Sequence, residues 1–254
     1  MKRTLLFLFC SMFVLAITAK TITPAASLPA YYEAIDGKSG KSLFDAVQKV
    51  TKTGYSSLGY DGLWAAYKYT DLYDNGYVWD MYSDCTWKSI NSNHCGNYSN
   101  ECDCYNREHS IPKSWYGGTT SGPGCDIFHL VPTDGKVNGI RSNYPFGEVS
   151  SADYNKHGNK RGTAKSITII GGNTIAGNTG ATISASGTVF EPRDEYKGDF
   201  ARGYMGALLK WAGEKAFTEG EGDKTFTTNF STGSFGLTKY GVALLMKWHR
   251  QDPV

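Results

Sequence analysis

The stretch 107–147 constrains this chain more than any other, because it gathers a hard-metal ligand, a titratable base and several cations. Glu108 and the side-chain carbonyl of Asn138 are oxygen donors of the kind that Mg²⁺ or Ca²⁺ prefers, and such ions often keep several waters. His109 follows Glu108 directly, and an imidazole with an ordinary pKa of about 6.5 can take a proton from an attacking water at neutral pH. These residues together predict metal-assisted hydrolysis of a phosphodiester.

The second half of this stretch has the spacing of a helix. Reading residues 134–142 as helical, with Thr133 as the N-cap, puts Asn138 and Arg141 on one face. The apolar side chains of the segment fall on another face and would pack the helix onto the core. Two glycines inside the segment count against a helix, since each destabilises a helix interior by about 1 kcal/mol relative to Ala.

The same residues carry a resemblance to a known family. The matching motifs are R-E-H-x-x-P at 107–112, L-x-P at 130–132, V-N-x-x-R-S-N at 137–143, P-F-G at 145–147, W-D-M-Y-S at 79–83, E-P-R-D-E-Y-K-G-D-F-A-R at 191–202 and W-H-R-Q-D-P-V at 248–254. In this shared order they resemble bacterial endonuclease I, the secreted or periplasmic branch of the His-Me finger (ββα-metal) nucleases. Each motif alone is weak, but their common order is strong.

The resemblance implies an α+β fold, a single domain built around a ββα-metal motif with surrounding helices and short strands. It implies that His109 is the general base and that Glu108 and Asn138 hold one divalent cation, Mg²⁺ or alternatively Ca²⁺ or Mn²⁺. An Arg would hold the scissile phosphate, and Arg141 is our first candidate ahead of Arg107 and Lys136. The expected products have 5′-phosphate ends.

Overall charge does not point to nucleic acid, because 26 Lys and Arg oppose 24 Asp and Glu. Phosphate contacts need only a local basic stripe. The best candidate stripe is the segment 156–165, although an ordinary solvated loop explains it equally well. The expected nucleic-acid contacts are Arg107, Lys136, Lys160 and Arg161.

The N-terminus reads as a signal peptide at 1–19. Lys2 and Arg3 precede an apolar run at 4–18, which is too short for a membrane span, and Ala19 suits a cleavage site. The remainder, 20–254, would be the endonuclease I-like domain, with a flexible lead-in to about residue 30. We therefore expect an exported protein, secreted or periplasmic, that acts as a monomer without a membrane span.

Cysteines gather just before the proposed catalytic pair. The disulfide candidates are Cys85, Cys95, Cys102, Cys104 and Cys125. Export favours at most two bridges with one thiol left over, and the sequence does not fix the pairing. A zinc site that uses His94 is the alternative, but the C-x-C spacing lacks the usual spacer of structural zinc sites.

Periodicity predicts the remaining elements. We expect helices at 42–52, with a Ser42-x-x-Asp45 capping box and a core-facing apolar stripe, and at 61–73, 194–211 and 238–250; strands at 77–82, 107–111 and 126–131; and a strand or hairpin region at 167–170 and 182–189. Two functions fit this chain. The first is a metal-dependent endonuclease that acts on DNA, with RNA as a second candidate substrate, and with little sequence preference. The alternative is a catalytically inactive, disulfide-stapled surface-binding module that recognises polysaccharide with its 17 Tyr and 6 Trp.

Overall fold

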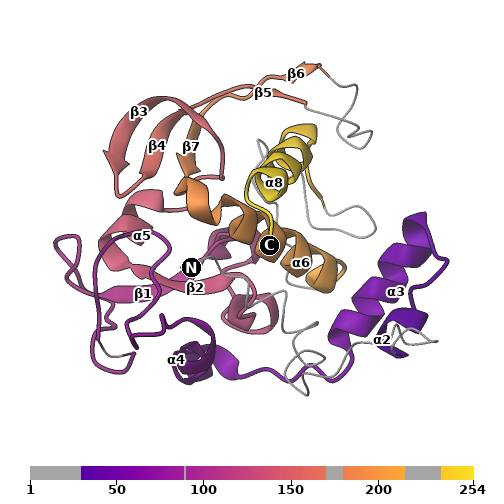
Figure 1. The fold of residues 1–254 in the computed structure, drawn as a ribbon, viewed down its shortest axis with the longest axis horizontal. Coiled ribbons are helices and arrows are strands. Elements are labelled where there is room, and N and C mark those ends of the chain that lie inside the picture. The colour runs from indigo at the N-terminus through magenta and orange to yellow at the C-terminus, as the bar shows by residue number, and fades with distance from the viewer. Residues whose placement is uncertain (1–29, 89, 170–179, 215–235) are drawn as a thin grey trace.

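The computed structural model describes residues 30–88, 90–169, 180–214 and 236–254, drawn in colour in Figure 1. The predicted signal peptide and most of the lead-in after it lie outside these residues. Within them the chain is α+β, as the sequence predicted, with helices around several small antiparallel sheets. No helix in this part of the chain combines the length and the apolar character needed to cross a bilayer.

Two antiparallel strands and a short helix form the centre of the fold (Figure 1). β1 (Tyr105–His109) pairs with β2 (Leu130–Asp134), and α5 (Gly135–Arg141) follows β2 without a loop. The sequence predicted three elements in this order. Both strands are shifted from the expected ranges, because β1 ends at His109 and β2 only begins at Leu130.

The helix after β2 is capped differently from the expectation. Asp134, and not Thr133, is the N-cap, because its carboxylate accepts a hydrogen bond from the Val137 amide. The other Asp134 oxygen accepts from the Cys102 amide, so the same carboxylate ties the helix start to the cysteine-rich segment. The start of α5 is therefore fixed on two sides.

The main hydrophobic core lies around two long helices. α6 (Lys197–Trp211), preceded by a 3-10 turn at Asp194–Tyr196, packs against α8 (Lys239–Gln251), and Trp248 is completely buried. The strands nearby are β3 (Val149–Lys156), β4 (Asn159–Ala164) and β7 (Thr188–Glu191), paired in that order, with a separate hairpin of β5 (Ile167–Thr168) and β6 (Thr182–Ile183). Both long helices were predicted close to these bounds.

The N-terminal helices are α2 (Ala30–Glu33), α3 (Gly40–Lys52) and α4 (Gly59–Thr70). α3 contacts α6 but buries none of its residues fully, so its apolar stripe is half-buried and not core as expected. The predicted capping box is also wrong, because α3 begins at Gly40, before Ser42. α4 buries Leu63 and Tyr67 in a second apolar cluster that includes residues of β1 and β2.

The strand predicted at 77–82 is absent from the described structure. The Val78 amide donates to Trp87 O, and the Tyr82 amide donates to the Asp80 side chain, so this segment is held by irregular contacts. Met81 and Tyr82 are both buried, which shows that neither side of the segment faces solvent. The alternation of aromatic residues reflected burial on both sides and not a sheet.

Two disulfides brace the entry to β1. Cys95 pairs with Cys104, directly before β1, and Cys85 pairs with Cys102. Cys125 keeps a buried thiol. Two bridges and one remaining thiol are what the cysteine count predicted, and bridged sulfurs are not free for the alternative zinc site.

Candidate active site

The strand β1 directs consecutive side chains to opposite faces, as any strand does. Asn106 and Glu108 face α5, whereas Arg107 and His109 face α4. In Figure 1 the strand pair runs between these two helices. The two proposed catalytic neighbours therefore lie in different surroundings, and each can be described separately.

Glu108 is buried on the α5 side, with 2% of its surface exposed. Its Oε1 accepts hydrogen bonds from the Tyr82 hydroxyl at 2.9 Å and from Nη1 of Arg141 at 2.7 Å. Burial raises the pKa of Glu108 to about 7, although Arg141 and Tyr82 favour the charged form. Since both side-chain bonds end on Oε1, the second carboxylate oxygen is the one suited to a metal.

Asn138 lies half-buried on the same side. Its Nδ2 donates to the Asn106 side-chain oxygen at 2.7 Å, which fixes the orientation of the Asn138 amide. The Asn138 carbonyl oxygen then keeps its acceptor capacity. Asn138 and Arg141 stand three residues apart on α5 and contact positions 106 and 108 of β1, so the helix brings Asn138 to the strand face that carries Glu108.

Arg141 is enclosed, with 1% of its surface exposed. Besides Glu108, its Nη1 donates to His109 O at 2.8 Å, and its Nη2 donates to Ser110 O at 2.6 Å. The guanidinium carbon also lies 4.9 Å from the Phe146 ring centroid. The sequence assigned Arg141 to the scissile phosphate, whereas in the structure it holds a carboxylate and two backbone carbonyls.

His109 ends β1 on the α4 side and is 8% exposed. Its Nε2 lies 3.3 Å from Gly124 O, so a proton on Nε2 can be donated there while Nδ1 remains an acceptor. Burial, with a smaller contribution from His129, lowers the pKa of His109 to about 3. The imidazole is therefore neutral at physiological pH, the form that a general base requires, but this low pKa makes it a weaker base than an ordinary histidine.

A second histidine, His129, anchors the turn that carries Gly124. Gly124 lies in the 3-10 turn Gly122–Cys125, and an earlier 3-10 turn spans Lys113–Tyr116. His129 is buried, and its Nε2 lies 2.6 Å from Pro123 O. His129 thus has a structural contact next to the carbonyl that meets His109.

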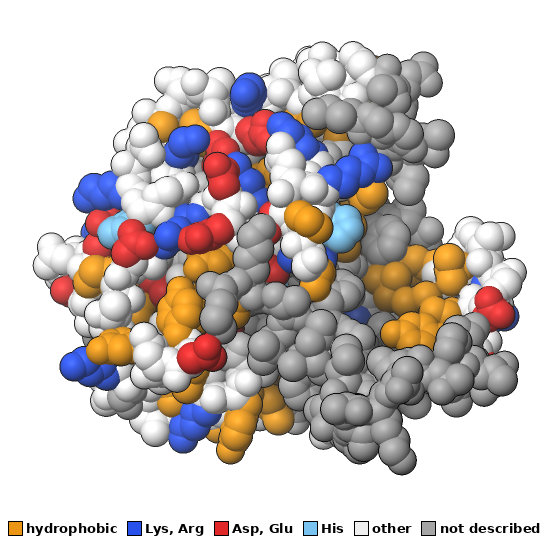
Figure 2. All heavy atoms as spheres, in the orientation of Figure 1, with side chains coloured by type: hydrophobic (Ala, Val, Ile, Leu, Met, Phe, Trp, Pro, Cys, Tyr) orange, Lys and Arg blue, Asp and Glu red, His pale blue; other side chains and the backbone are white. Residues whose placement is uncertain are grey.

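The remaining predicted nucleic-acid contacts are mostly paired with acids. The basic segment 156–165 covers the end of β3, the turn and β4, where Lys160 lies 3.8 Å from Glu191 and Arg161 lies 2.9 Å from Asp153. Figure 2 shows basic and acidic side chains interleaved over the visible face. Lys136 is half-buried on α5, and no ion pair is found for it within the part of the chain that the structure describes.

Arg107 also lies away from open solvent, with 12% of its side chain exposed. Its guanidinium carbon lies 3.4 Å from the Tyr60 ring centroid and 4.3 Å from that of Trp64. The sequence pattern did not predict that Tyr60 and Trp64 of α4 contact Arg107. By contrast, the sequence could have identified Asn106 as a neighbour of the metal ligands, because it stands two residues before Glu108 on the same strand face.

The donor chemistry on the α5 side suits a hard divalent cation. Glu108 and Asn138 offer a carboxylate and an amide oxygen, which Mg²⁺ and Ca²⁺ prefer. A second group, Cys85, Cys102 and Asp134, brings ligand atoms within 4.8 Å of one another. These two sulfurs form a disulfide and have no thiolate to offer a metal, so this group does not fit.

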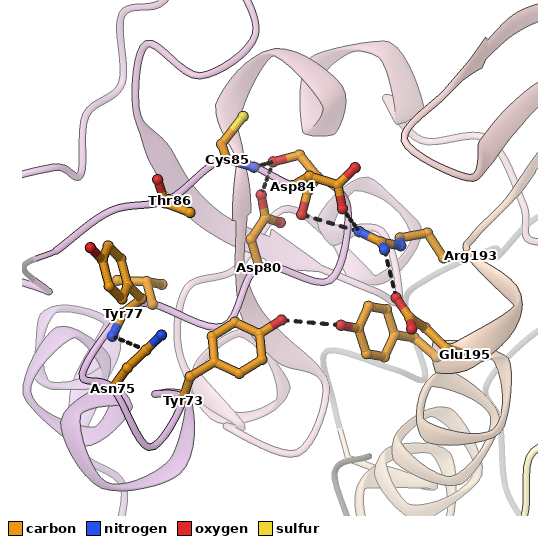
Figure 3. A pocket seen from close by; sticks show the side chains of 12 residues that line it. Tyr73, Asn75, Tyr77, Asp80, Asp84, Cys85, Thr86, Arg193 and Glu195 are labelled. Atoms are coloured by element: carbon orange, nitrogen blue, oxygen red, sulfur yellow. Dashed lines mark hydrogen bonds and ion pairs between the residues drawn. The ribbon is translucent and has the colours of Figure 1, made fainter. Parts of the chain in front are cut away.

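A pocket of about 470 Å³ is lined by residues of the segment 73–86 and by Arg193, Glu195 and Tyr196 (Figure 3). Tyr73, Asn75 and Tyr77 line one side, and Arg193 lines another between the carboxylates of Asp84 and Glu195, both at 2.7 Å. Because two carboxylates already pair with the guanidinium, the pocket is poorly suited to phosphate. None of the sequence-predicted catalytic or metal-ligand residues lines it.

Comparison with known proteins gives two kinds of match. Residues 39–254 match the family model described as Endonuclease I. The chain is similar to the "Extracellular ribonuclease" of Bacillus amyloliquefaciens, with 31% identity over 242 residues, covering 93% of this chain and 71% of the relative. It is similar also to the "Extracellular ribonuclease" of Bacillus subtilis (strain 168), with 30% identity over 242 residues, covering 93% of this chain and 70% of the relative.

Proposed function

Because this chain belongs to the endonuclease I family of nucleases, we propose that it is an exported, divalent-metal-dependent endonuclease that cleaves RNA and DNA with little sequence preference, leaving 5′-phosphate ends. The observation that carries the proposal is the placement of Glu108 and Asn138 at one face of β1, with His109 next in sequence. A hard-metal site thus adjoins a neutral imidazole at the end of one strand.

We assign the metal to the α5 side of β1. The second carboxylate oxygen of Glu108 and the amide oxygen of Asn138 would hold it, while Asn106 fixes the orientation of Asn138. A divalent cation there would offset the charge that builds up on the phosphate oxygens during hydrolysis. Arg141 positions Glu108 and also the backbone at 109 and 110, so we assign it a holding role.

His109 is the proposed general base. Donation from Nε2 to Gly124 O leaves Nδ1 to take a proton from the attacking water. Burial keeps the ring neutral, so no proton has to be lost before the reaction begins. The exposed Lys113 lies near enough to lower the pKa of His109, which makes it a candidate cation for the substrate phosphate that the sequence did not suggest.

The choice of substrate rests on the comparisons. The family model is described as Endonuclease I, and both relatives are named extracellular ribonucleases. We therefore propose RNA as a substrate alongside DNA. Two disulfides and the extracellular relatives support export into an oxidising compartment.

The test is cleavage of plasmid DNA and of a long RNA by the purified, oxidised protein, with Mg²⁺, Mn²⁺ or Ca²⁺ and with EDTA. We expect cleavage with a divalent cation, none with EDTA, and loss of at least about 100-fold in His109→Ala, the usual range for a general base. His157→Ala is the matched control, because His157 lies on the β3–β4 hairpin against Glu101 and Asp84. Equal activity of His109→Ala and wild type would reject the proposal.

The alternative is the surface-binding module without activity. The tyrosine-lined pocket in Figure 3 is the observation that favours it, since aromatic rings beside polar groups suit sugars. Intact plasmid and RNA under every metal condition, together with retention on a polysaccharide resin, would support that reading.

A further inference from the structure

The side chains on the α4 side of β1 form a continuous stack that leads to His109. In order, its members are His94, Trp64, Arg107, Tyr60 and His109. The His94 and Trp64 rings lie 4.2 Å apart at 14°. The Arg107 guanidinium lies between Trp64 and Tyr60, and the Tyr60 ring is stacked with His109 at 5.7 Å and 23°.

From this stack we propose that Tyr60 is a positioning residue for His109, and that Arg107 holds Tyr60 in place. The inference rests on the proposed function, because it assumes that His109 acts as the base. It gives Arg107 a different role from the phosphate contact that its charge suggested.

The geometry of His109 shows why a stacked ring matters. Its hydrogen-bond contact from Nε2 to Gly124 O is long at 3.3 Å, and by itself this contact holds the imidazole only weakly against rotation about its side-chain bonds. A ring against the face of the imidazole blocks that rotation and keeps Nδ1 aimed in one direction. Misplacement of a reacting group by about 1 Å can lower a rate about 100-fold.

Tyr60 is in turn fixed from its own helix and from β1. It stands in the first turn of α4, and Nη1 of Arg107 donates to the Tyr60 carbonyl while the guanidinium covers its ring at 3.4 Å. The same Nη1 lies 3.3 Å from Asp61 Oδ1. The Nη1 atom of Arg107 is thus engaged within the protein, and the faces of the guanidinium are covered by the Tyr60 and Trp64 rings.

The first test compares Tyr60→Phe, Tyr60→Leu and Tyr69→Leu in the metal-supported cleavage of a quenched oligonucleotide. Tyr69→Leu is the matched control, because it makes the same change on the same helix at an exposed position outside the stack. We expect Tyr60→Phe to match wild type, and Tyr60→Leu to lose about tenfold or more in kcat with KM within about twofold, the pattern of a lost catalytic geometry. A kcat for Tyr60→Leu that equals that of Tyr69→Leu, with both proteins folded by circular dichroism, overturns the proposal.

Arg107→Met keeps the inference testable if Tyr60→Leu does not fold. A guanidinium that only supports Tyr60 should lower kcat when removed and leave the salt dependence of KM unchanged. A guanidinium that contacts the substrate phosphate should instead raise KM and flatten its dependence on salt. The second result would overturn the assignment of Arg107.

Rescue by free imidazole separates this inference from the proposed function. In His109→Gly, added imidazole should restore part of the activity by occupying the space beside Tyr60. In the double variant with Tyr60→Leu, the imidazole concentration for half-rescue should rise about fivefold, the worth of one aromatic pair. If His109→Gly is fully active, the proposed function fails; if it is inactive and its rescue ignores Tyr60, only the positioning role fails.

Discussion

Replacing Arg141 by Met tests how the candidate metal side is held. The change removes a guanidinium that is 1% exposed while keeping an unbranched apolar side chain in its place. It leaves the buried Glu108 without its cation and the carbonyls of His109 and Ser110 without these donors. Breaking a buried ion pair by removing one partner destabilises a protein by about 3 to 5 kcal/mol.

Glu108 can partly avoid that penalty. Its pKa is already raised to about 7 by burial, so the carboxyl can take a proton when Arg141 is lost. We therefore expect a loss near the lower end, about 3 kcal/mol, which lowers the melting temperature by roughly 10 °C in a chain of this size.

The assay is urea unfolding in EDTA with the disulfides oxidised, followed by tryptophan fluorescence. Glu108→Gln should be destabilised less, and the double variant should be more stable than the summed single changes by about 1 to 3 kcal/mol, the range for groups in contact. Arg161→Met is the control, since the Arg161–Asp153 pair is more exposed and should contribute less than about 1 kcal/mol. Strict additivity, with Arg141→Met no worse than Arg161→Met, would refute the view that Arg141 holds Glu108.

The other predictions concern pH, glycines and a disulfide. Burial lowers the pKa of His109 to about 3, so on acidification the unfolded protein binds a proton at His109 before the folded protein does. Below about pH 6.5 the wild type should therefore lose about 1.4 kcal/mol of stability per pH unit relative to His109→Ala, down to the folded-state pKa. Paired denaturant titrations of the two proteins measure this difference. Within α6, a Cβ on Gly198 would lie 1.8 Å from Asp252 O, whereas one on Gly206 meets nothing within 4 Å. Gly198→Ala should therefore destabilise by about 1 to 3 kcal/mol and Gly206→Ala should stabilise by up to about 1 kcal/mol, and equal melting temperatures would contradict this. Replacing both Cys95 and Cys104 by Ser should destabilise by about 2 to 3 kcal/mol, measurable by the same urea titration, with an unchanged midpoint as the contrary result.

The sequence predicted the helix after β2 well, in spite of its glycines. Spacing alone placed Asn138 and Arg141 on one face, and the structure has both on the β1 side. The two glycines that argued against a helix have a packing reason, because a Cβ on Gly135 or Gly139 would lie within 2.7 Å of the Tyr98 ring or hydroxyl. Helix propensity predicts that the two glycines destabilise the helix, but only the fold shows that the absence of a Cβ there leaves space for Tyr98.

Other features depend on partners that are distant in sequence. The segment 156–165 looked like a free basic stripe, yet Lys156 and His157 meet Glu101, more than fifty positions earlier in the chain. The burial of Arg141 and the stack around Arg107 also arise from elements that no local spacing brings together. Local patterns thus did not show which charges remain available to a substrate.

Because side chains alternate along β1, we expect substitutions on the α5 side, near Glu108, to affect different kinetic parameters from substitutions on the α4 side, near His109. The Glu108 side chain is held by Tyr82 and Arg141 on one face, and the His109 ring by Tyr60 and Gly124 on the other. The two sets meet at the His109 carbonyl, which accepts a hydrogen bond from Arg141. A change confined to the metal ligands, such as Asn138→Ala, should weaken metal binding, with more Mg²⁺ needed for half-maximal cleavage. Changes on the α4 side should lower kcat at saturating Mg²⁺ and leave that requirement unchanged. A Tyr60→Leu protein that needed more Mg²⁺ in the same proportion as Asn138→Ala would show that the two faces do not act separately.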